Sequence, residues 1–117
     1  MTYLAQLIDD VVVNKVELNE QTISIGRHPD NTIQINDEAV SGKHAIITVK
    51  SSDYLDNTLE VFMEDLGSTN GSMINNKNIK GKVQLSHQDV IRIGWNEFKL
   101  VQQNDDALEK TAHALNL

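Results

Sequence analysis

The 117-residue chain contains no cysteine and only one proline, Pro29. The absence of cysteine excludes a disulfide-stapled scaffold, a thiol nucleophile and a zinc site built from thiolates. No apolar run approaches the roughly 20 residues that a membrane-spanning helix needs. The first residues also lack the basic, apolar and small-residue order of a secretory signal peptide, so we expect a cytoplasmic location. Apolar residues make up 39% and charged residues 23% of the chain, which is typical of one globular domain rather than of a disordered segment.

Positive charge is scarce as well. Lys and Arg together number 10 against 17 for Asp and Glu, so the formal net charge is −7. A general nucleic-acid-binding domain normally presents a basic face, and electrostatic binding to a membrane surface needs clustered Lys and Arg. The charge balance therefore argues against nucleic acid and membranes as partners. It does not exclude an anionic ligand, because exposed charges farther apart than about 8 Å are screened at physiological salt.

Apolar residues recur mainly with a period of two, the pattern of half-buried β-strands. Ile23 and Ile25 alternate with polar residues, and Ile33 and Ile35 repeat that pattern. Many short strands without an interrupting helical pattern indicate an all-β sandwich or barrel. The predicted strands are Tyr3–Ile8, Val13–Leu18, Thr22–Gly26, Thr32–Ile35, His44–Val49, Leu59–Asp65, Met73–Asn75, Asn78–Ile79, Val83–Leu85, Val90–Gly94 and Glu97–Val101.

Two of these strands have distinctive patterns. Val13–Leu18 mixes apolar with polar and charged residues, which fits an exposed or edge strand, whereas His44–Val49 is apolar on both faces, as in a central strand. The strongest short turn signal is Asn70-Gly71, because both residues tolerate positive φ. Trp95-Asn96 is the predicted turn between the last two strands. Turn residues thus separate the strands along the whole series.

The last fourteen residues differ from the rest. Asp105-Asp106 precedes Leu108, Ala112 and Leu115, a spacing that puts the apolar side chains on one face of a helix, with carboxylates at its start. A helix this short is marginal on its own, so the segment is a short helix docked on the sandwich, a partner-binding helix or a frayed terminus. We therefore divide the chain into a domain at 1–103 and a C-terminal tail at 104–117.

Polar clusters stand at the ends of predicted strands, where loops on a rigid scaffold commonly carry function. Together with their flanking strands they resemble the forkhead-associated (FHA) domain, over roughly residues 3 to 102. The resemblance implies an eleven-stranded β-sandwich that recognises phosphothreonine. The matching stretches, in family order and spacing, are Ile23–Arg27, Asn31–Ile35, Val40–Ala45, Glu64–Ser72 and Asp89–Gly94.

The resemblance also implies a role for individual residues. A phosphothreonine carries about −1.5 to −2 charge and three strong acceptor oxygens, so its site needs a planar cation, hydroxyl donors and backbone N–H groups. Arg27 would bind the phosphate, Ser41 would donate its hydroxyl, and Thr69 would donate from the neighbouring loop. Asn70 would pair with the peptide backbone beside the phosphothreonine. The predicted phosphopeptide-binding set is Arg27, Ser41, Lys43, Ser68, Thr69 and Asn70.

Other residues are expected to support the site. The resemblance places His44 beneath the loops as a brace, and Gly26, Gly67 and Gly71 are predicted to shape the backbone. The family often has Arg, Lys or Asn directly after the serine as a further phosphate contact, and here that residue is Gly42, which has no side chain. The loss of one charge-assisted hydrogen bond would weaken binding by about 1.5–3 kcal/mol.

The expected partner is a phosphothreonine-containing protein or peptide that a Ser/Thr kinase has modified. In the family, loop residues around the phosphate site select the third residue after the phosphothreonine, and the candidates here are Ala39, Asn75, Asn76 and Lys77. The uncharged Ala39 argues against an acidic selector at that position, whereas the other three would favour a polar or acidic residue. We expect a monomer.

Two other functions can be weighed against phosphothreonine recognition. A phosphate-independent interaction scaffold would keep the sandwich and use a sheet face, a strand edge or the tail, and Gly42 motivates that alternative. Ser41, His44 and Asp65 are the residue types of a hydrolytic triad, but nothing resembles a nucleophile elbow or an oxyanion hole, so we expect no enzyme. The histidines show no metal-ligand spacing, and no cofactor is expected.

Overall fold

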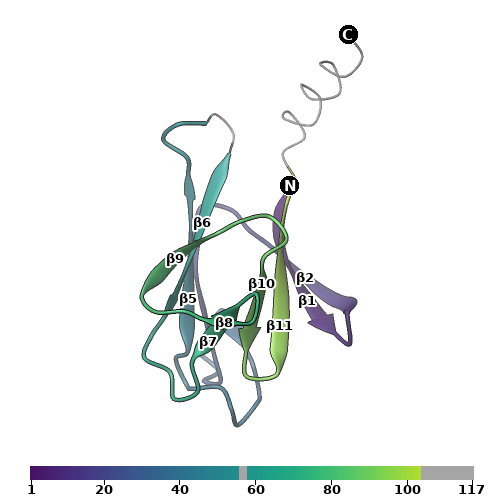
Figure 1. Ribbon diagram of the computed structural model, residues 1–117, viewed down its shortest axis with the longest axis vertical. Coiled ribbons are helices and arrows are strands. Elements are labelled where there is room, and N and C mark those ends of the chain that lie inside the picture. The colour runs from purple at the N-terminus through teal and green to yellow at the C-terminus, as the bar shows by residue number, and fades with distance from the viewer. Residues whose placement is uncertain (56–57, 104–117) are drawn as a thin grey trace.

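A computed structural model describes residues 1–55 and 58–103; the predicted tail lies outside these residues. The described chain forms two β-sheets that pack face to face (Figure 1). One sheet has six strands in the spatial order β2 (Val11–Glu17), β1 (Thr2–Ile8), β11 (Asn96–Gln102), β10 (Val90–Ile93), β7 (Ser72–Ile74) and β8 (Lys77–Asn78). The other has five, in the order β4 (Ile33–Gln34), β3 (Gln21–Gly26), β5 (Ala45–Ser51), β6 (Leu59–Asp65) and β9 (Lys82–Leu85). The predicted sandwich of eleven strands is therefore confirmed.

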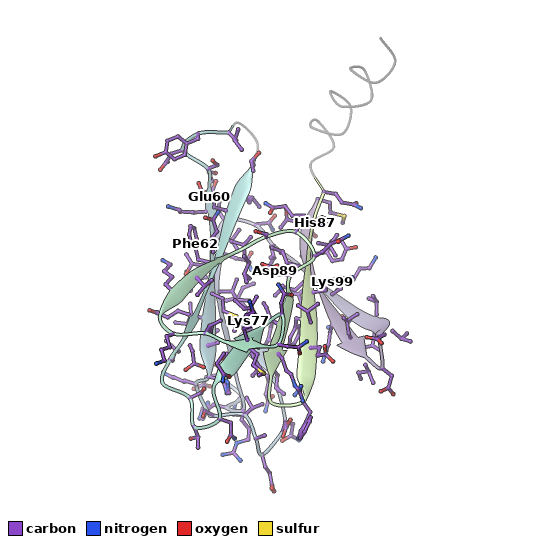
Figure 2. The ribbon with its side chains drawn as sticks, in the orientation of Figure 1. Glu60, Phe62, Lys77, His87, Asp89 and Lys99 are labelled. Carbon is purple, nitrogen blue, oxygen red and sulfur yellow. The ribbon has the colours of Figure 1, made fainter. Side chains whose placement is uncertain are left out.

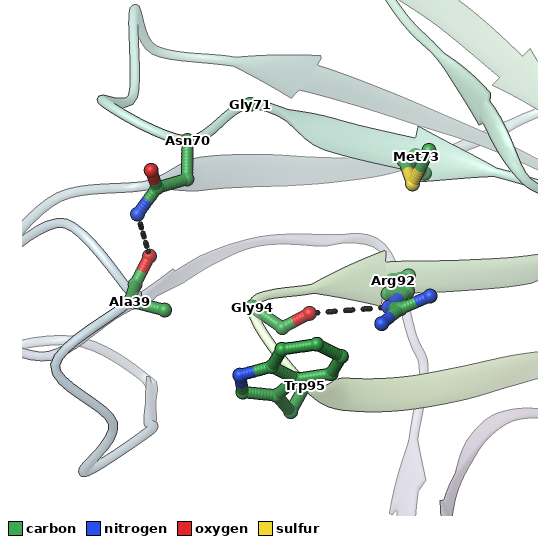
Figure 3. Close-up of a pocket in the computed structure, with 7 residues that line it drawn as sticks. All are labelled: Ala39, Asn70, Gly71, Met73, Arg92, Gly94 and Trp95. Atoms are coloured by element: carbon green, nitrogen blue, oxygen red, sulfur yellow. Dashed lines mark hydrogen bonds between the residues drawn. The ribbon is translucent and has the colours of Figure 1, made fainter.

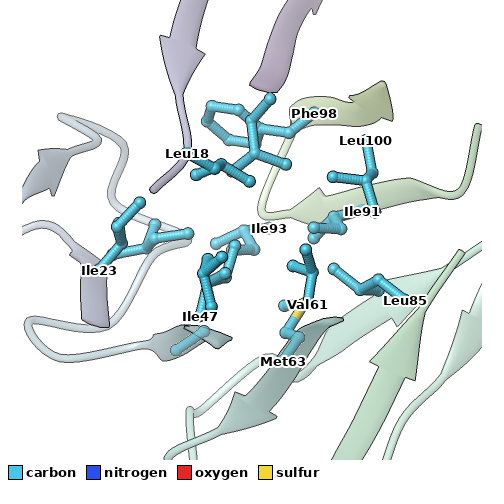
Figure 4. Packing of buried hydrophobic residues seen from close by; sticks show 14 of the residues in the cluster. Leu18, Ile23, Ile47, Val61, Met63, Leu85, Ile91, Ile93, Phe98 and Leu100 are labelled. Atoms are coloured by element: carbon cyan, nitrogen blue, oxygen red, sulfur yellow. The ribbon is translucent and has the colours of Figure 1, made fainter. Parts of the chain in front are cut away.

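The core lies between the two sheets and follows the period-two pattern of the sequence. Ile23, Ile47 and Met63 on the five-stranded sheet face Phe98 and Leu100 on the six-stranded sheet, and all five side chains are fully buried (Figure 4). Removing one large aliphatic or aromatic side chain from water stabilises a fold by about 1.5–3 kcal/mol. The packed sheets thus provide a rigid base for the loops at their ends.

The outward face of the five-stranded sheet carries an aromatic ring flanked by two lysines. On the five-stranded sheet, the ammonium groups of Lys50 and Lys82 lie 5.3 and 5.2 Å from the ring centroid of Phe62 (Figure 2). Cation–π contacts at exposed positions stabilise by about 0.5–1 kcal/mol each. No helix in the described part of the chain is long and apolar enough to cross a membrane.

Turn geometry corrects several predicted strand ends. Asn75 and Asn76 have φ of 52° and 67° and form the turn between β7 and β8, so the strand predicted to reach Asn75 ends at Ile74. In the last hairpin Gly94 has φ of 60° and Asn96 pairs with Ile93, which moves the predicted turn from Trp95-Asn96 to Gly94-Trp95. Tight two-residue hairpins need positive φ, and glycine and asparagine supply it at low cost.

The two ends of the described chain are neighbours. β1 and β11 run antiparallel, and the amino group of Met1 donates to the carbonyl of Gln103 at 2.6 Å, while the Gln103 N–H donates back to the Met1 carbonyl at 2.9 Å. The Gly94-Trp95 turn lies at the opposite end of β11. The turn end of the sandwich is therefore far from Met1 and Gln103 (Figure 1).

Candidate functional site

Ser41 links the three loops that carry the predicted site residues. Its carbonyl accepts a hydrogen bond from the backbone N–H of Arg27, at the end of β3, at 2.9 Å. Its hydroxyl oxygen accepts from the backbone N–H of Thr69, in the β6–β7 loop, at 3.0 Å. The Thr69 bond occupies a lone pair of the oxygen and leaves the hydroxyl proton free to donate. The sequence-distant clusters thus meet at one point.

His44 fixes this meeting point from inside the protein. Its side chain is fully buried. Nδ1 accepts from the backbone N–H of Ser41 at 3.0 Å, which places the proton of the neutral ring on Nε2, and Nε2 donates to the carbonyl of Gly71 at 2.8 Å. One imidazole therefore joins the Ser41 loop to the β6–β7 loop, as the predicted brace would.

Asp65 organises the β6–β7 loop. Its carboxylate accepts from the hydroxyls of Ser68 and Ser72, both at 2.6 Å, and from the backbone N–H of Ser68 at 2.9 Å. Partial burial raises the pKa of Asp65, but the hydrogen bonds from the two serines, helped by the nearby His44 ring, hold the pKa below its usual 3.8. The Ser68 hydroxyl, included in the predicted binding set, is thus used within the loop.

Several polar groups near Ser41 have no partner among the described residues. The side chain of Arg27 is exposed, and the structure gives its guanidinium no hydrogen bond or ion pair. The exposed Thr69 hydroxyl likewise has no hydrogen-bond partner among the described residues. A planar cation and two hydroxyls thus stand at one end of the sandwich with their donor capacity unused, which is the chemistry that an oxyanion requires.

Lys43 points elsewhere. It lines a separate hollow on the five-stranded sheet, together with His28, Asn31, Ile46 and Leu66 among others. Lys43 is exposed in the loop before β5, whereas the next two residues, His44 and Ala45, are both buried. The structure therefore does not group Lys43 with Arg27, Ser41 and Thr69.

Asn70 lies between the loops and a second hollow. Its side-chain amide donates to the carbonyl of Ala39 at 2.9 Å (Figure 3). The hollow of about 280 Å³ beside it is lined by Ala39, Asn70, Gly71, Met73, Arg92, Gly94 and Trp95. Arg92 stacks 4.8 Å from the ring of Trp95, and its Nε donates to the Gly94 carbonyl at 3.3 Å. Sequence reasoning had not placed Met73, Arg92 and Trp95 here, because they come from two strands and a turn that only the fold brings together.

Asp37 holds the walls of this hollow together. Its carboxylate accepts from the backbone N–H of Ala39 at 2.9 Å and from that of Trp95 at 3.3 Å. The bond from Ala39 is the main reason that the pKa of Asp37 lies below its usual value, with further support from Trp95 and Asn96 and against some opposition from desolvation. The motif Asn36-Asp37 in a loop is a local signal for such a turn, but its long-range partner is not visible in the sequence.

The remaining selector candidates lie apart from this hollow. The Asn75 side chain donates to Asp89 at 2.9 Å and accepts from the backbone N–H of Val90 at 3.0 Å. Asn75 and Asn76 line another depression, next to Glu97. Of the predicted selectors, only Ala39 borders the hollow beside Asn70.

The glycines of the site differ in what they require. Gly67 and Gly71 have φ of 74° and 78°, where a side chain is strained. A Cβ on Gly26 would lie 2.3 Å from the Gly42 carbonyl oxygen, so the two loops can approach only if residue 26 is glycine. A Cβ on Gly42 would meet nothing within 4 Å.

The geometry does not form a hydrolytic triad. His44 bonds the backbone N–H of Ser41 rather than its hydroxyl, and its other nitrogen donates to Gly71. Asp65 lies 3.8 Å from that same nitrogen, beyond hydrogen-bonding distance. Within residues 1–55 and 58–103, no three His, Asp or Glu side chains are grouped so that they could hold a metal ion.

Comparison with known proteins gives matches over most of the described domain. A family model described as the FHA domain matches residues 23–94. The FHA domain-containing protein FhaB of Mycobacterium tuberculosis is 30% identical over 86 residues, which is 74% of this chain and 51% of that protein, so the chain spans about half the length of this curated relative.

Solved structures extend the likeness to the whole sandwich. The FHA domain of the CT664 protein from Chlamydia trachomatis is 28% identical with a TM-score of 0.75, covering 88% of this chain and 98% of that one. A structure described as an analysis of phosphothreonine-dependent FHA domain interactions is 27% identical with a TM-score of 0.68, covering 87% and 98%.

Proposed function

Since this chain belongs to the FHA domain family, we propose that it is a phosphothreonine-dependent interaction module that recruits proteins modified by a Ser/Thr kinase. Family membership indicates a binding role rather than a catalytic one. One solved relative is described by phosphothreonine-dependent interactions. The observation that carries the proposal for this chain is that Arg27 and Thr69 both bond to Ser41 through their backbone N–H groups, while the exposed side chain of Arg27 has no partner among the described residues.

In this proposal the phosphate sits over Ser41. Arg27 supplies the planar cation, and the hydroxyls of Ser41 and Thr69 donate to phosphate oxygens. The loops are held by hydrogen bonds of His44 and Asp65 before any ligand arrives, so little conformational entropy is lost on binding. The low entropy cost of binding helps the site to hold a phosphate although the protein has a net charge of −7.

Asn70 would hold the peptide in register. Its amide bridges to Ala39 at the mouth of the hollow, and the same group can bond a peptide backbone that crosses there. Ser68 and Lys43 remain predicted contributors. Ser68 would act by shaping the β6–β7 loop, and Lys43 would contact peptide residues that flank the phosphothreonine. A cytoplasmic location, where Ser/Thr kinases act, remains part of the same prediction.

The test is binding to a peptide library with phosphothreonine fixed at its centre and degenerate flanks, compared with the unphosphorylated library. Arg27→Ala should weaken phosphopeptide binding by about 1.5–3 kcal/mol, more than tenfold, because a charge-assisted hydrogen bond is lost. Lys50→Ala is the matched control: it removes one positive charge near the far end of β5 and should change binding little. No binding above the unphosphorylated library would refute the proposal.

A phosphate-independent scaffold is the second candidate, and Gly42 favours it, because that position contributes no side chain beside the phosphate. Pull-downs before and after phosphatase treatment separate the two functions. Partners that stay bound after phosphatase treatment, and to Arg27→Ala as well, would support the scaffold. Partners lost in both conditions would support phosphothreonine recognition.

A further inference from the structure

A hollow of about 510 Å³ lies at the end of the sandwich where β11 stops. Tyr54 and Leu55, in the connection between β5 and β6, border it and are 90% and 61% exposed. Leu59 and Leu85 continue the apolar lining from one end of β6 and of β9. The β5–β6 connection lies at the same end of the molecule as the N-terminus (Figure 1). Large apolar side chains that gather around one hollow mark a place where another apolar surface packs.

The chain leaves the described domain from the wall of this hollow. The backbone N–H of Gln102 donates to Nδ1 of His87 at 2.9 Å, and the Gln102 side-chain amide donates to the carbonyl of Leu59. All three residues line the hollow. The next residue, Gln103, exchanges two hydrogen bonds with Met1. These bonds fix the point from which residues 104–117 continue, so that segment starts beside the hollow.

We propose that residues 104–117 form a short helix whose apolar face, made of Leu108, Ala112 and Leu115, covers this hollow. Only four residues separate Gln103 from Leu108, so the first apolar side chain can reach the hollow while β11 stays in place. On a helix, Leu108 and Leu115 lie about 10 Å apart along one face, since each residue rises about 1.5 Å. A helix this short is marginal alone in water, and packing of its apolar face supplies the missing stability.

Tethering selects this segment over a second copy of the chain as the occupant. A group joined to its site by a short linker is present at an effective concentration in the millimolar range. A second copy has to approach from solution, and the net charge of −7 on each chain opposes that approach. The segment of the same chain therefore reaches the hollow first.

Polar groups at the hollow suit the acidic start of this segment. His87 accepts from Gln102 at Nδ1, which places the proton of the neutral ring on Nε2, and Nε2 has no partner among the described residues. Asp105 and Asp106 follow Gln102 by three and four residues, so one of these carboxylates can accept from Nε2. Glu60 is the one acidic side chain among the described residues that line the hollow (Figure 2).

The chain has no cysteine, so two introduced cysteines report on a single contact in the full-length protein. Ser86→Cys, at the hollow, is combined either with Ala112→Cys on the apolar face or with Lys110→Cys, which lies on the opposite face of the same helix. The two tail positions have nearly the same tether length. In dilute protein with oxidised glutathione, the pair with Ala112→Cys should form its disulfide within one chain at least several-fold faster than the pair with Lys110→Cys.

Thermal unfolding of the full chain provides a second measurement without cysteines. Leu108→Gln should lower the unfolding midpoint by several degrees, because it removes apolar contact with the hollow. Lys110→Gln is the matched control and should leave the midpoint unchanged. Equal disulfide rates for the two pairs, or a Leu108→Gln midpoint equal to that of the wild type, would overturn the proposal. A disulfide that joins two chains would also overturn it and would give the hollow to a second copy.

Discussion

A lysine at position 42 should turn this domain into a tighter phosphothreonine binder. Gly42 does not require glycine: its φ lies outside the left-handed range and an added Cβ would meet nothing within 4 Å. Its carbonyl is held by the N–H of His28 at 3.1 Å and by the amide of Asn31 at 2.7 Å, so the backbone should stay in place. Gly42→Lys supplies the side-chain contact that the family often has directly after the serine.

The magnitude follows from the contact added. A charge-assisted hydrogen bond contributes about 1.5–3 kcal/mol, which corresponds to more than a tenfold gain in affinity. Gly42→Ala is the control: it offers no contact and should only stabilise the fold, by about 0.4–1 kcal/mol, because it restricts the unfolded chain. The assay is fluorescence anisotropy with the labelled phosphothreonine library, together with thermal unfolding of both variants. If Gly42→Lys binds no tighter than Gly42→Ala while both remain folded, residue 42 does not face the phosphate.

Three further predictions concern the framework of the site. His44→Ala should lower the free energy of unfolding in urea by at least about 2 kcal/mol, because the buried imidazole is removed and the partly buried Ser41 N–H and Gly71 carbonyl each lose a partner; a smaller loss would mean that His44 is not the brace. Because the pKa of Asp65 is lower in the folded than in the unfolded protein, its ionised carboxylate stabilises the fold at pH values above the unfolded pKa near 3.8. This stabilisation is lost as the pH falls through the folded pKa. The stability difference between wild type and Asp65→Asn, measured by urea unfolding, should therefore shrink below about pH 4, and a constant difference would contradict this assignment. Gly26→Ala should lower the thermal midpoint and abolish library binding where Gly42→Ala does neither, since its Cβ would overlap the Gly42 carbonyl; an unaffected variant would show that the two loops can separate freely.

Much of the fold could be predicted because burial follows strand alternation. Each predicted strand overlaps an observed one, and Leu59–Asp65 has the observed bounds. The errors lie at turns, where the side-chain pattern says little about φ. Asn70-Gly71 had the strongest local signal, yet only Gly71 has positive φ there, while Asp9-Asp10 and Asn75-Asn76 adopt it at both positions.

The sequence indicated which loops carry the candidate site, and the structure joins these loops through hydrogen bonds of Arg27, Thr69 and Asn70 to Ser41 and Ala39. The roles of these residues in binding stay predictions. The hollow beside Asn70 was missed, because its walls depend on Asp37 bonding to Trp95, 58 residues away. Contacts of that sequence separation follow from the packing of two sheets and leave no local pattern.

The pairing of the two ends also determines how the domain responds to force. Met1 and Gln103 bond to each other at the tips of antiparallel neighbours, so tension applied through both ends would load the β1–β11 hydrogen bonds one after another. Strands pulled in this way separate one hydrogen bond at a time, which takes less force than breaking all of the bonds at once by shearing. If the domain is tethered at both ends, we expect mechanical pulling to peel away β1 first and with it the β2 edge, while the loops around Ser41 on the other side of the core remain closed.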